Sequence, residues 1–304
     1  MIRDLLYNHP TWEVGTTIVV LSVLVSWIGL YVFDRFVHVS IRSRHNDVAG
    51  FIIAIIGVVY AVLLAFIAVA AWESFDNANR IVEEEANLVG NLYRDSVAVD
   101  EPAKGKMHRA LQEYLDIVIH QEWPAQQHGE ISTDAWKPVQ RLHHAVTGID
   151  AKSLGQSVVE AEMLKTLNDL YSARRLRLLA AHDGIPNTIW WIIVMGGVIT
   201  VCFTYFFGMP SMKMHYAMTG VLAASMALVM VLIVALDWPF RGNVSVTPEP
   251  FEAVQADIKQ QQEAYHRAKE AREAAAAANQ AGQPDQASQR CSDDPTLAGC
   301  TTQQ

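Results

Sequence analysis

Apolar residues gather in four long segments of the chain, with polar stretches between them and after the last one. Each segment has about 20 residues, the length that a helix needs to cross the hydrocarbon core of a bilayer. Because lipid offers the backbone no hydrogen bonds, such segments are expected to be α-helices. The pattern predicts four membrane spans: Val14–Phe33, Val48–Trp72, Ile189–Phe207 and Tyr216–Leu236.

The polar stretch between the second and third spans shows the apolar spacing of helices, and none of it alternates like a strand. The sequence therefore predicts an all-α fold, with four transmembrane spans and a helical extramembrane region between spans two and three. The first helix of that region continues the second span without a break. Pro124 is expected to stop the second. The expected helices are Glu73–Val97, Pro102–Glu122, Thr133–Val146 and Ser157–Ala181.

Changes in composition divide the chain into four parts. The tail is expected to be helical over Phe251–Asn279, because Ala, Glu, Gln and Lys favour helix. From Gln280 onwards its composition is typical of disorder. The parts are an N-terminal transmembrane pair (1–72), a helical extramembrane region (73–188), a C-terminal transmembrane pair (189–254) and a polar tail (255–304).

Small residues recur along the second span at steps of three and four, which places them on one stripe of the helix. Such stripes let helix backbones approach closely in lipid. One interpretation is ordinary helix packing, and the other is a helix that lines the axis of an oligomer. In the second case, bulky residues face neighbours or form an apolar constriction, which can gate ions by dewetting. The stripe is Gly50, Ala54, Gly57, Ala61, Ala65 and Ala68, and the bulky residues are Ile53, Ile56, Tyr60, Leu63 and Phe66.

The interiors of the four spans contain no Asp, Glu, Lys, Arg or His. Proton relays and coupled transporters usually place such groups there, so their absence favours passive permeation or a structural anchor. No catalytic or nucleotide-binding motif occurs, and we expect no enzyme activity. The formal net charge of −9 argues against a nucleic-acid partner. The spacing of Cys and His predicts neither a metal site nor another cofactor.

Two charged clusters lie outside the spans. The acidic run from Glu83 to Glu85 is expected to be a solvated helix face, with an acidic ring in an oligomer as the alternative. Three arginines between Arg174 and Arg177 precede the third span. They are expected to anchor the region at the membrane surface, and attraction of anions or lipid headgroups is the alternative.

Basic residues also bear on the orientation in the membrane. The short loops 34–47 and 208–215 carry more Lys and Arg than the N-terminal segment, which favours a cytoplasmic location for both loops. The arginines before the third span favour the opposite orientation. With the short loops in the cytoplasm the tail is periplasmic, where Cys291 and Cys300 can form a disulfide. Two free thiols are the alternative.

Two motifs connect this arrangement with a known family. Ala65-Phe66, followed by Ala70-Ala71-Trp72-Glu73 and Leu92-Tyr93-Arg94, resembles the end of the second bestrophin helix with its Trp-Glu signature. Leu236-Asp237-Trp238-Pro239-Phe240-Arg241-Gly242 resembles the acidic-x-Pro-Phe-Gly segment after the last bestrophin helix. Over about residues 14–254 the chain is similar to a family of bacterial membrane proteins of unknown function that are described as bestrophin-like.

Bestrophins are pentameric anion channels whose second helix lines the pore and whose termini are cytoplasmic. The resemblance implies a homo-oligomer, a pentamer, in the lipid bilayer of a bacterial inner membrane, with Val48–Trp72 at its axis and anions as the permeating ions. The Asn-Val-Ser-Val-Thr sequence after Gly242 lacks the acidic cluster that holds calcium in the animal channels, so calcium gating is not supported.

We hypothesise a bestrophin-like passive ion channel. The alternative is a non-conducting, membrane-anchored helical sensor or scaffold that binds a partner through residues 73–188.

Overall fold

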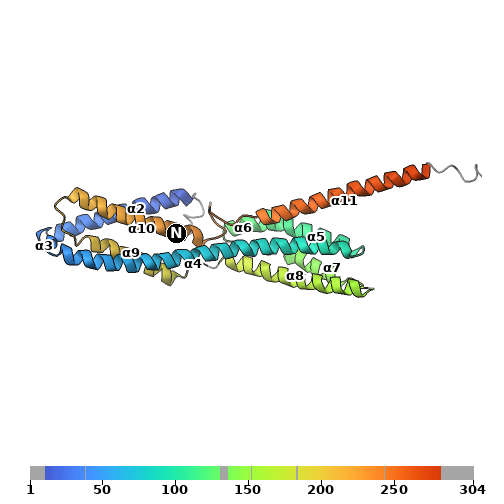
Figure 1. The fold of residues 1–304 in the computed structure, drawn as a ribbon, viewed down its shortest axis with the longest axis horizontal. Helices are drawn as coiled ribbons and strands as arrows, with labels where there is room; N and C mark the ends of the chain where they lie inside the picture. Colours follow the sequence, from blue (N-terminus) through green and yellow to red (C-terminus); the bar gives the residue numbers. More distant parts are fainter. Residues whose placement is uncertain are drawn as a thin grey trace, which may run out of the picture. The chain divides into compact units, whose positions relative to one another are not determined.

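A computed structural model of the chain describes residues 11–37, 39–130, 136–151, 153–182, 184–242 and 244–281. Every regular element in this part is helical, as predicted (Figure 1). The chain divides between Val254 and Gln255 into two units, which are described separately. Cys291 and Cys300, and with them the predicted disulfide, lie outside the described residues.

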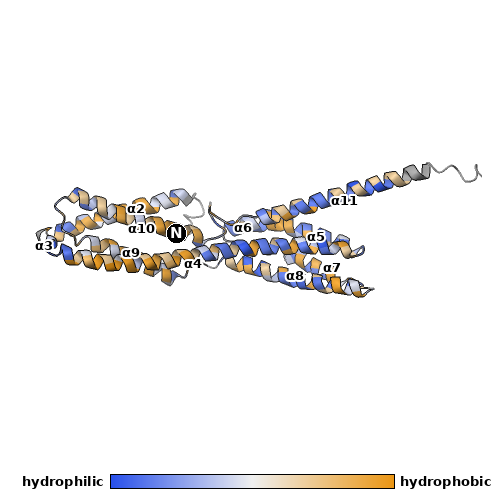
Figure 2. Cartoon of the chain, viewed as in Figure 1, coloured by the Kyte–Doolittle hydropathy of each residue, from blue (hydrophilic) through white to orange (hydrophobic). Residues whose placement is uncertain are grey.

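Four helices of the described part are long and apolar enough to cross a membrane, which confirms the predicted spans. Figure 2 shows apolar residues concentrated on these segments. The third helix is shorter than predicted, because a turn leads from its end toward Gly208 and Pro210. The helices are α2 (Thr11–Phe36), α4 (Asn46–Asp95), α9 (Asn187–Thr204) and α10 (Met212–Asp237).

Helix α4 is continuous for 50 residues, so it extends from the membrane-spanning part into the polar region, as the sequence predicts. Its first half packs against α9 and α10, and α2 packs on α10. Its second half packs against α8. One helix therefore serves both the transmembrane bundle and the extramembrane bundle.

Within the described residues, the extramembrane bundle contains three longer helices in addition to α4. The predicted apolar sides of these helices and of the second half of α4 are buried, including Val82, Val89, Leu111 and Leu167. The described helices of this region are η1 (Ser96–Ala98), α5 (Ala103–Ile117), η2 (Val118–Glu122), α6 (Trp123–Gln127), α7 (Trp136–Thr147) and α8 (Leu154–Ala180).

Two helix boundaries differ from the prediction. The chain stays helical past Pro124 to Gln127, because the wider turn of η2 places Pro124 in the first turn of α6, where a missing N–H costs little. Helix α8 begins before Ser157, since the Ser153 hydroxyl oxygen accepts the backbone N–H of Gln156 at 3.2 Å and caps the helix.

Helix α11 (Glu249–Ala281) crosses the division between the two units. In the second unit, every side chain from Glu263 to Ala276 is exposed. The helix itself agrees with the prediction of a helical, polar tail from Phe251. The four-part division of the chain stays a prediction.

The two short loops between the spans lie against each other. The side chain of Asn46 exchanges two hydrogen bonds with the backbone of Gly208, at 3.0 and 2.9 Å. Arg42 lies in the last turn of the short helix α3 (Val39–Ser43). It pairs with Asp34 and donates to the carbonyl oxygen of Tyr205 at 3.1 Å. These bonds close the loop end of the transmembrane bundle.

Gly208 tests this closure, because a Cβ there would lie 2.3 Å from the backbone nitrogen of Ser43. We expect Gly208→Ala to lower the free energy of unfolding by about 1–3 kcal/mol, since backbone atoms must move. The measurement is thermal unfolding in detergent. Gly90→Ala is the control, because its Cβ would make only an ordinary contact at 3.7 Å with Val254. Equal stability of the two variants would contradict the close packing of the loops.

Candidate functional site

One side of α4 packs inside the chain. Tyr60 is only 6% exposed, and its hydroxyl donates to the carbonyl oxygen of Ile193 at 2.8 Å. A Cβ on Gly196 or Gly197 would come within 2.6 or 2.9 Å of the tyrosine side chain. Under the axial interpretation Tyr60 faces a neighbour or forms a constriction; in the structure it packs against α9 of the same chain, so a constriction at Tyr60 is wrong. The Tyr60 side chain packs against Gly196 and Gly197 of α9. This contact is not predicted from the sequence, because a Gly-Gly pair within a span does not indicate which residue packs on it.

The small stripe lies beside this packed side and meets little of the chain. Apart from the adjacent residues and the backbone of α4 itself, no atom lies within 4 Å of a Cβ built on Gly50 or Gly57. Ala68 differs, because it packs against the buried cluster around Tyr60. The stripe is therefore open to a second molecule over most of its length. Its exposed alanines are Ala54, Ala61 and Ala65.

Part of the stripe forms one wall of an apolar groove between α4 and α10. The groove has a volume of about 500 Å³ and opens toward the surroundings of the chain. Gly57, Ala61 and Ala65 contribute its α4 wall, and Met226 and Val229 contribute to the opposite wall. A helix or an acyl chain of matching shape would fill it with apolar contacts.

Bulky apolar side chains cover the far side of α4, and the chain leaves them exposed. Phe66 is 72% exposed, and Val62 and Val58, one and two helical steps before it, are 50% and 64% exposed. Residues four apart lie on one face of a helix, so these three form a line. Their neighbours on this side are also exposed: Phe51, Ile55, Val59 and Val69.

The first family motif lies where this side of α4 changes from apolar to polar residues. Trp72 is exposed, and its ring stacks on that of Phe75 with the centroids 6.3 Å apart. Glu73 is exposed as well. The motif thus lies at the end of the apolar segment of α4, before the polar half of the helix.

The second family motif connects the last span to the extramembrane helices. Asp237 is buried, and its carboxylate accepts the backbone N–H of Ile185 at 2.5 Å, which joins the end of α10 to the entry of α9. The Pro239 carbonyl oxygen accepts the backbone N–H of Val246 at 2.7 Å, and Gly242 has a φ of 78°, so the segment turns sharply. Phe240 is buried with its ring 5.6 Å from that of Trp123 in α6.

Four charged side chains are fully buried in the extramembrane bundle and form what we call the buried ion cluster: Glu85, Glu122, Arg174 and Arg177. Arg177 donates to Glu85 at 2.7 and 3.1 Å and to Glu122 at 2.9 Å. Arg174 forms a two-bond pair with Glu122, one bond being 2.8 Å long. The cluster joins α4 and α8 to the turn η2.

The environment of the cluster favours the charged form of its arginines. Burial opposes the charge of Arg177, but its neighbours outweigh this effect, Glu85 most of all and then Tyr114 and Glu122, and raise the pKa of the guanidinium. Tyr114 donates its hydroxyl proton to Glu85, and burial followed by that carboxylate raises the pKa of the phenol. Two acids and two bases thus balance each other away from water.

These positions correct two expectations. Arg174 and Arg177 do not anchor the membrane surface, because residues three apart share a helix side and both face the core, whereas Arg175 between them is exposed. Glu85 is not part of a solvated face, although Glu83 and Glu84 are exposed. Nothing local in the sequence indicates these pairs, because the partners lie 52 to 92 residues apart along the chain.

Removing one partner from the cluster leaves a buried charge without compensation. We expect Arg177→Met to cost about 3–5 kcal/mol of stability. Arg175→Met makes the same chemical change one helical side away, and we expect a cost of at most about 0.5 kcal/mol. Unfolding of both variants in detergent measures the difference. Equal losses would show that the cluster does not stabilise the bundle.

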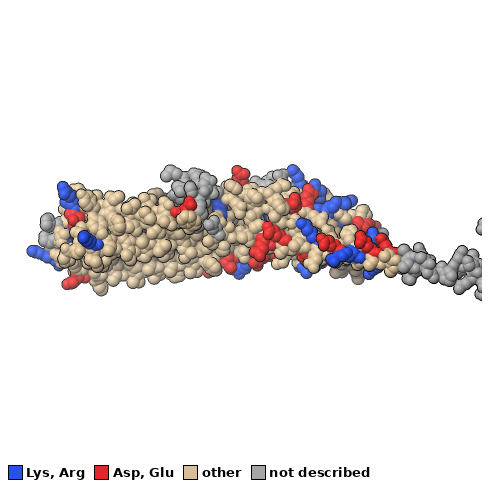
Figure 3. All heavy atoms as spheres, turned by 90° about the horizontal axis from the view of Figure 1, so that it is seen from above, with Lys and Arg blue, Asp and Glu red and all other residues tan. Residues whose placement is uncertain are grey.

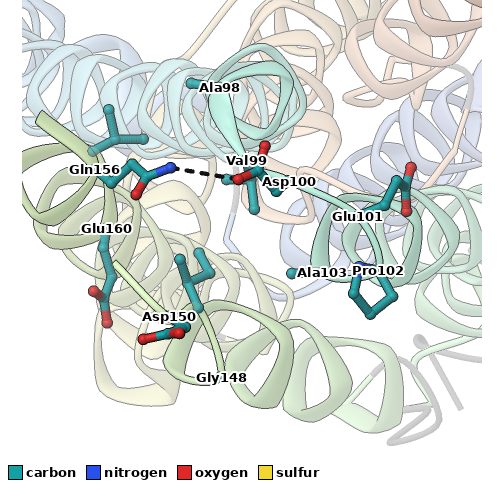
Figure 4. A pocket seen from close by; sticks show the side chains of 12 residues that line it. Ala98, Val99, Asp100, Glu101, Pro102, Ala103, Gly148, Asp150, Gln156 and Glu160 are labelled. Atoms are coloured by element: carbon teal, nitrogen blue, oxygen red, sulfur yellow. Dashed lines mark hydrogen bonds between the residues drawn. The ribbon is translucent and has the colours of Figure 1, made fainter. Parts of the chain in front are cut away.

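An acidic pocket of about 160 Å³ lies at the turns that join η1 to α5 and α7 to α8 (Figure 4). The Gln156 amide donates to Asp100 at 3.5 Å across it, and Glu101 accepts the backbone N–H of Gly105 at 3.2 Å. Asp150 also lines the pocket. Within the described residues, no three His, Cys, Asp or Glu side chains are arranged to hold a metal ion.

The family model of the Bestrophin-like domain matches residues 20–251, and the chain therefore belongs to the Bestrophin-like family. No curated protein is significantly similar to it.

Solved structures share the fold. Two are variants of a bacterial bestrophin homologue from Klebsiella pneumoniae, each 12% identical. One has a TM-score of 0.60 and the comparison covers 81% of this chain and 97% of that one. The other has a TM-score of 0.58, with 80% and 96% covered. A third, described as a membrane protein, is 12% identical with a TM-score of 0.56, and 80% and 97% are covered.

Proposed function

We propose that this chain is the subunit of an oligomeric, passive ion channel in which α4 lines the ion path. The observation that carries the proposal is the far side of α4, which is bulky, apolar and left uncovered by the chain. In the most apolar stretch of this helix, only 11% of the residues are buried within the chain. A side that packs against nothing in the subunit is available to face the axis of an assembly.

The line formed by Val58, Val62 and Phe66 supplies the constriction in this proposal. Repeated around an axis, exposed apolar side chains form rings from which water withdraws when the passage is narrow. Phe66 is the largest and most exposed of the three. It therefore defines the narrowest ring.

The small stripe supplies the contacts between subunits. Gly50 and Gly57 lie open in the single chain, and the groove beside Gly57 is apolar. Close approach of helices in lipid depends on such small residues. The resemblance to bestrophins implies five subunits.

Permeation rather than pumping fits the uncharged spans. The segments 14–33, 48–72, 189–207 and 216–236 contain no Asp, Glu, Lys, Arg or His, the residues that usually relay protons or bind a coupling ion. Figure 3 shows the corresponding surface as a broad area without Lys, Arg, Asp or Glu. The bestrophin channels that the chain resembles are not enzymes, and we expect no enzyme activity here.

Phe66→Ala should widen the constriction, so we expect a higher conductance or open probability in planar bilayers that contain the purified protein. The control is Phe36→Ala, which removes the same ring from an exposed position (83%) at the end of α2. Currents from Phe36→Ala should match those of the unaltered chain. No conductance from the unaltered chain or from Phe66→Ala would overturn the channel proposal.

A non-conducting sensor or scaffold is the second candidate. It is favoured by three large apolar side chains that the extramembrane bundle leaves exposed: Val97, Leu154 and Val158. Such a protein needs no axial lumen, and absence of conductance from a stable oligomer would support it.

We also propose that the chain lies in the bacterial inner membrane with the short loops in the cytoplasm. Arg174 and Arg177 favoured the opposite orientation, but both are neutralised in the buried ion cluster. Arg35, Arg44 and Lys213 in the short loops remain exposed. The positive-inside rule then favours a cytoplasmic location for these loops.

Reporter fusions test the orientation. Alkaline phosphatase fused after Ala281 should be active, because it would be periplasmic, whereas the same enzyme inserted after Arg44 should be inactive. The reverse pattern would show that the extramembrane region is cytoplasmic.

A further inference from the structure

Beyond Trp72 the outward side of α4 becomes acidic. Glu73 lies seven residues after Phe66, within about 20° of two full turns, and Glu84 lies eighteen residues after Phe66, or about five full turns. Both glutamates are exposed, and α4 has no break between Phe66 and Glu84. The same side that presents the apolar constriction therefore continues as a side that presents carboxylates.

Basic residues do not cancel this charge. Arg80 lies on the same side, but it pairs with Asp76 at 2.6 Å, so the two charges offset each other. Among the described residues, neither Glu73 nor Glu84 forms an ion pair. Glu85, the next acid along the helix, is turned into the core and held by Arg177. Two carboxylates per subunit thus remain on this side.

We propose that Glu73 and Glu84 make the ion path select cations over anions. This inference rests on the proposed function, because it requires α4 to line the path. Copies of each glutamate around an axis form an acidic ring, and such rings concentrate cations and repel anions. Glu73 lies nearest to the constriction, about 10 Å along the helix from Phe66.

The opposite mouth of the path does not offset this preference. At the short-loop end, the exposed charged residues next to the start of α4, Arg44 and Asp47, have opposite signs. Exposed Arg35 and Lys213 at the same end belong to α2 and α10, which do not line the path in this proposal. The resemblance to bestrophins implies anions, but the charges that decide selectivity belong to the individual chain. We therefore assign the ion selectivity to the negative charge of Glu73 and Glu84 at the extramembrane mouth.

The test is the reversal potential of currents through the purified protein in a planar bilayer with unequal KCl on the two sides. We expect it to be displaced toward the potassium equilibrium potential. In the double variant Glu73→Gln/Glu84→Gln, the displacement should shrink toward zero. The matched control Glu130→Gln/Glu160→Gln removes two carboxylates that are not on α4, and it should keep the original value.

Each outcome decides a different claim. Displacement toward the chloride potential, with current intact, would overturn cation selectivity and leave the channel proposal standing. An unchanged reversal potential in Glu73→Gln/Glu84→Gln, or an equal shift in the control, would overturn the assignment to these residues. Absence of current from every variant that elutes as an intact oligomer would overturn the channel proposal itself.

Discussion

Helix α4 runs without a break from the membrane into water, so its two halves lie in different environments. Over the membrane-spanning length its outward side presents apolar groups such as Val62 and Phe66, whereas over the extramembrane length the same side presents Glu73 and Glu84. The change occurs between Phe66 and Glu73, within about two turns. The inward side stays apolar throughout, with Tyr60 in the transmembrane bundle and Val82 and Val89 in the extramembrane bundle. The placement of the other helices follows from this division.

The buried ion cluster holds the aqueous half of α4 in one position. Glu85 on α4 and Arg177 on α8 are both inaccessible to water, and each needs the other to offset the cost of burial. Because α8 leads directly toward α9, the pairing also relates the extramembrane bundle to the third span. The segment around Asp237 and Phe240 makes a second connection, from the end of α10 to α6.

The sequence predicts the spans and the all-α fold well, because hydrophobicity and helical spacing are local properties. It also predicts the buried sides of α5 and α8, where apolar periodicity is clear. It could not predict the ion cluster, since nothing local to Arg177 indicates that Glu85 lies beside it. Likewise Tyr60 looks like any bulky residue of a span until Gly196 and Gly197 are placed against it. The small stripe and Phe66 stay predictions, because a single chain does not show what covers them.

Membership of the Bestrophin-like family fixes the architecture, and the central claim is that the uncovered side of α4 faces the axis of an assembly. The most direct test is a density map of the purified oligomer. The account predicts rotational symmetry, with the α4 helices innermost and Phe66 side chains facing the axis. A map in which α4 lies at the perimeter, with Phe66 facing lipid or detergent, would contradict it.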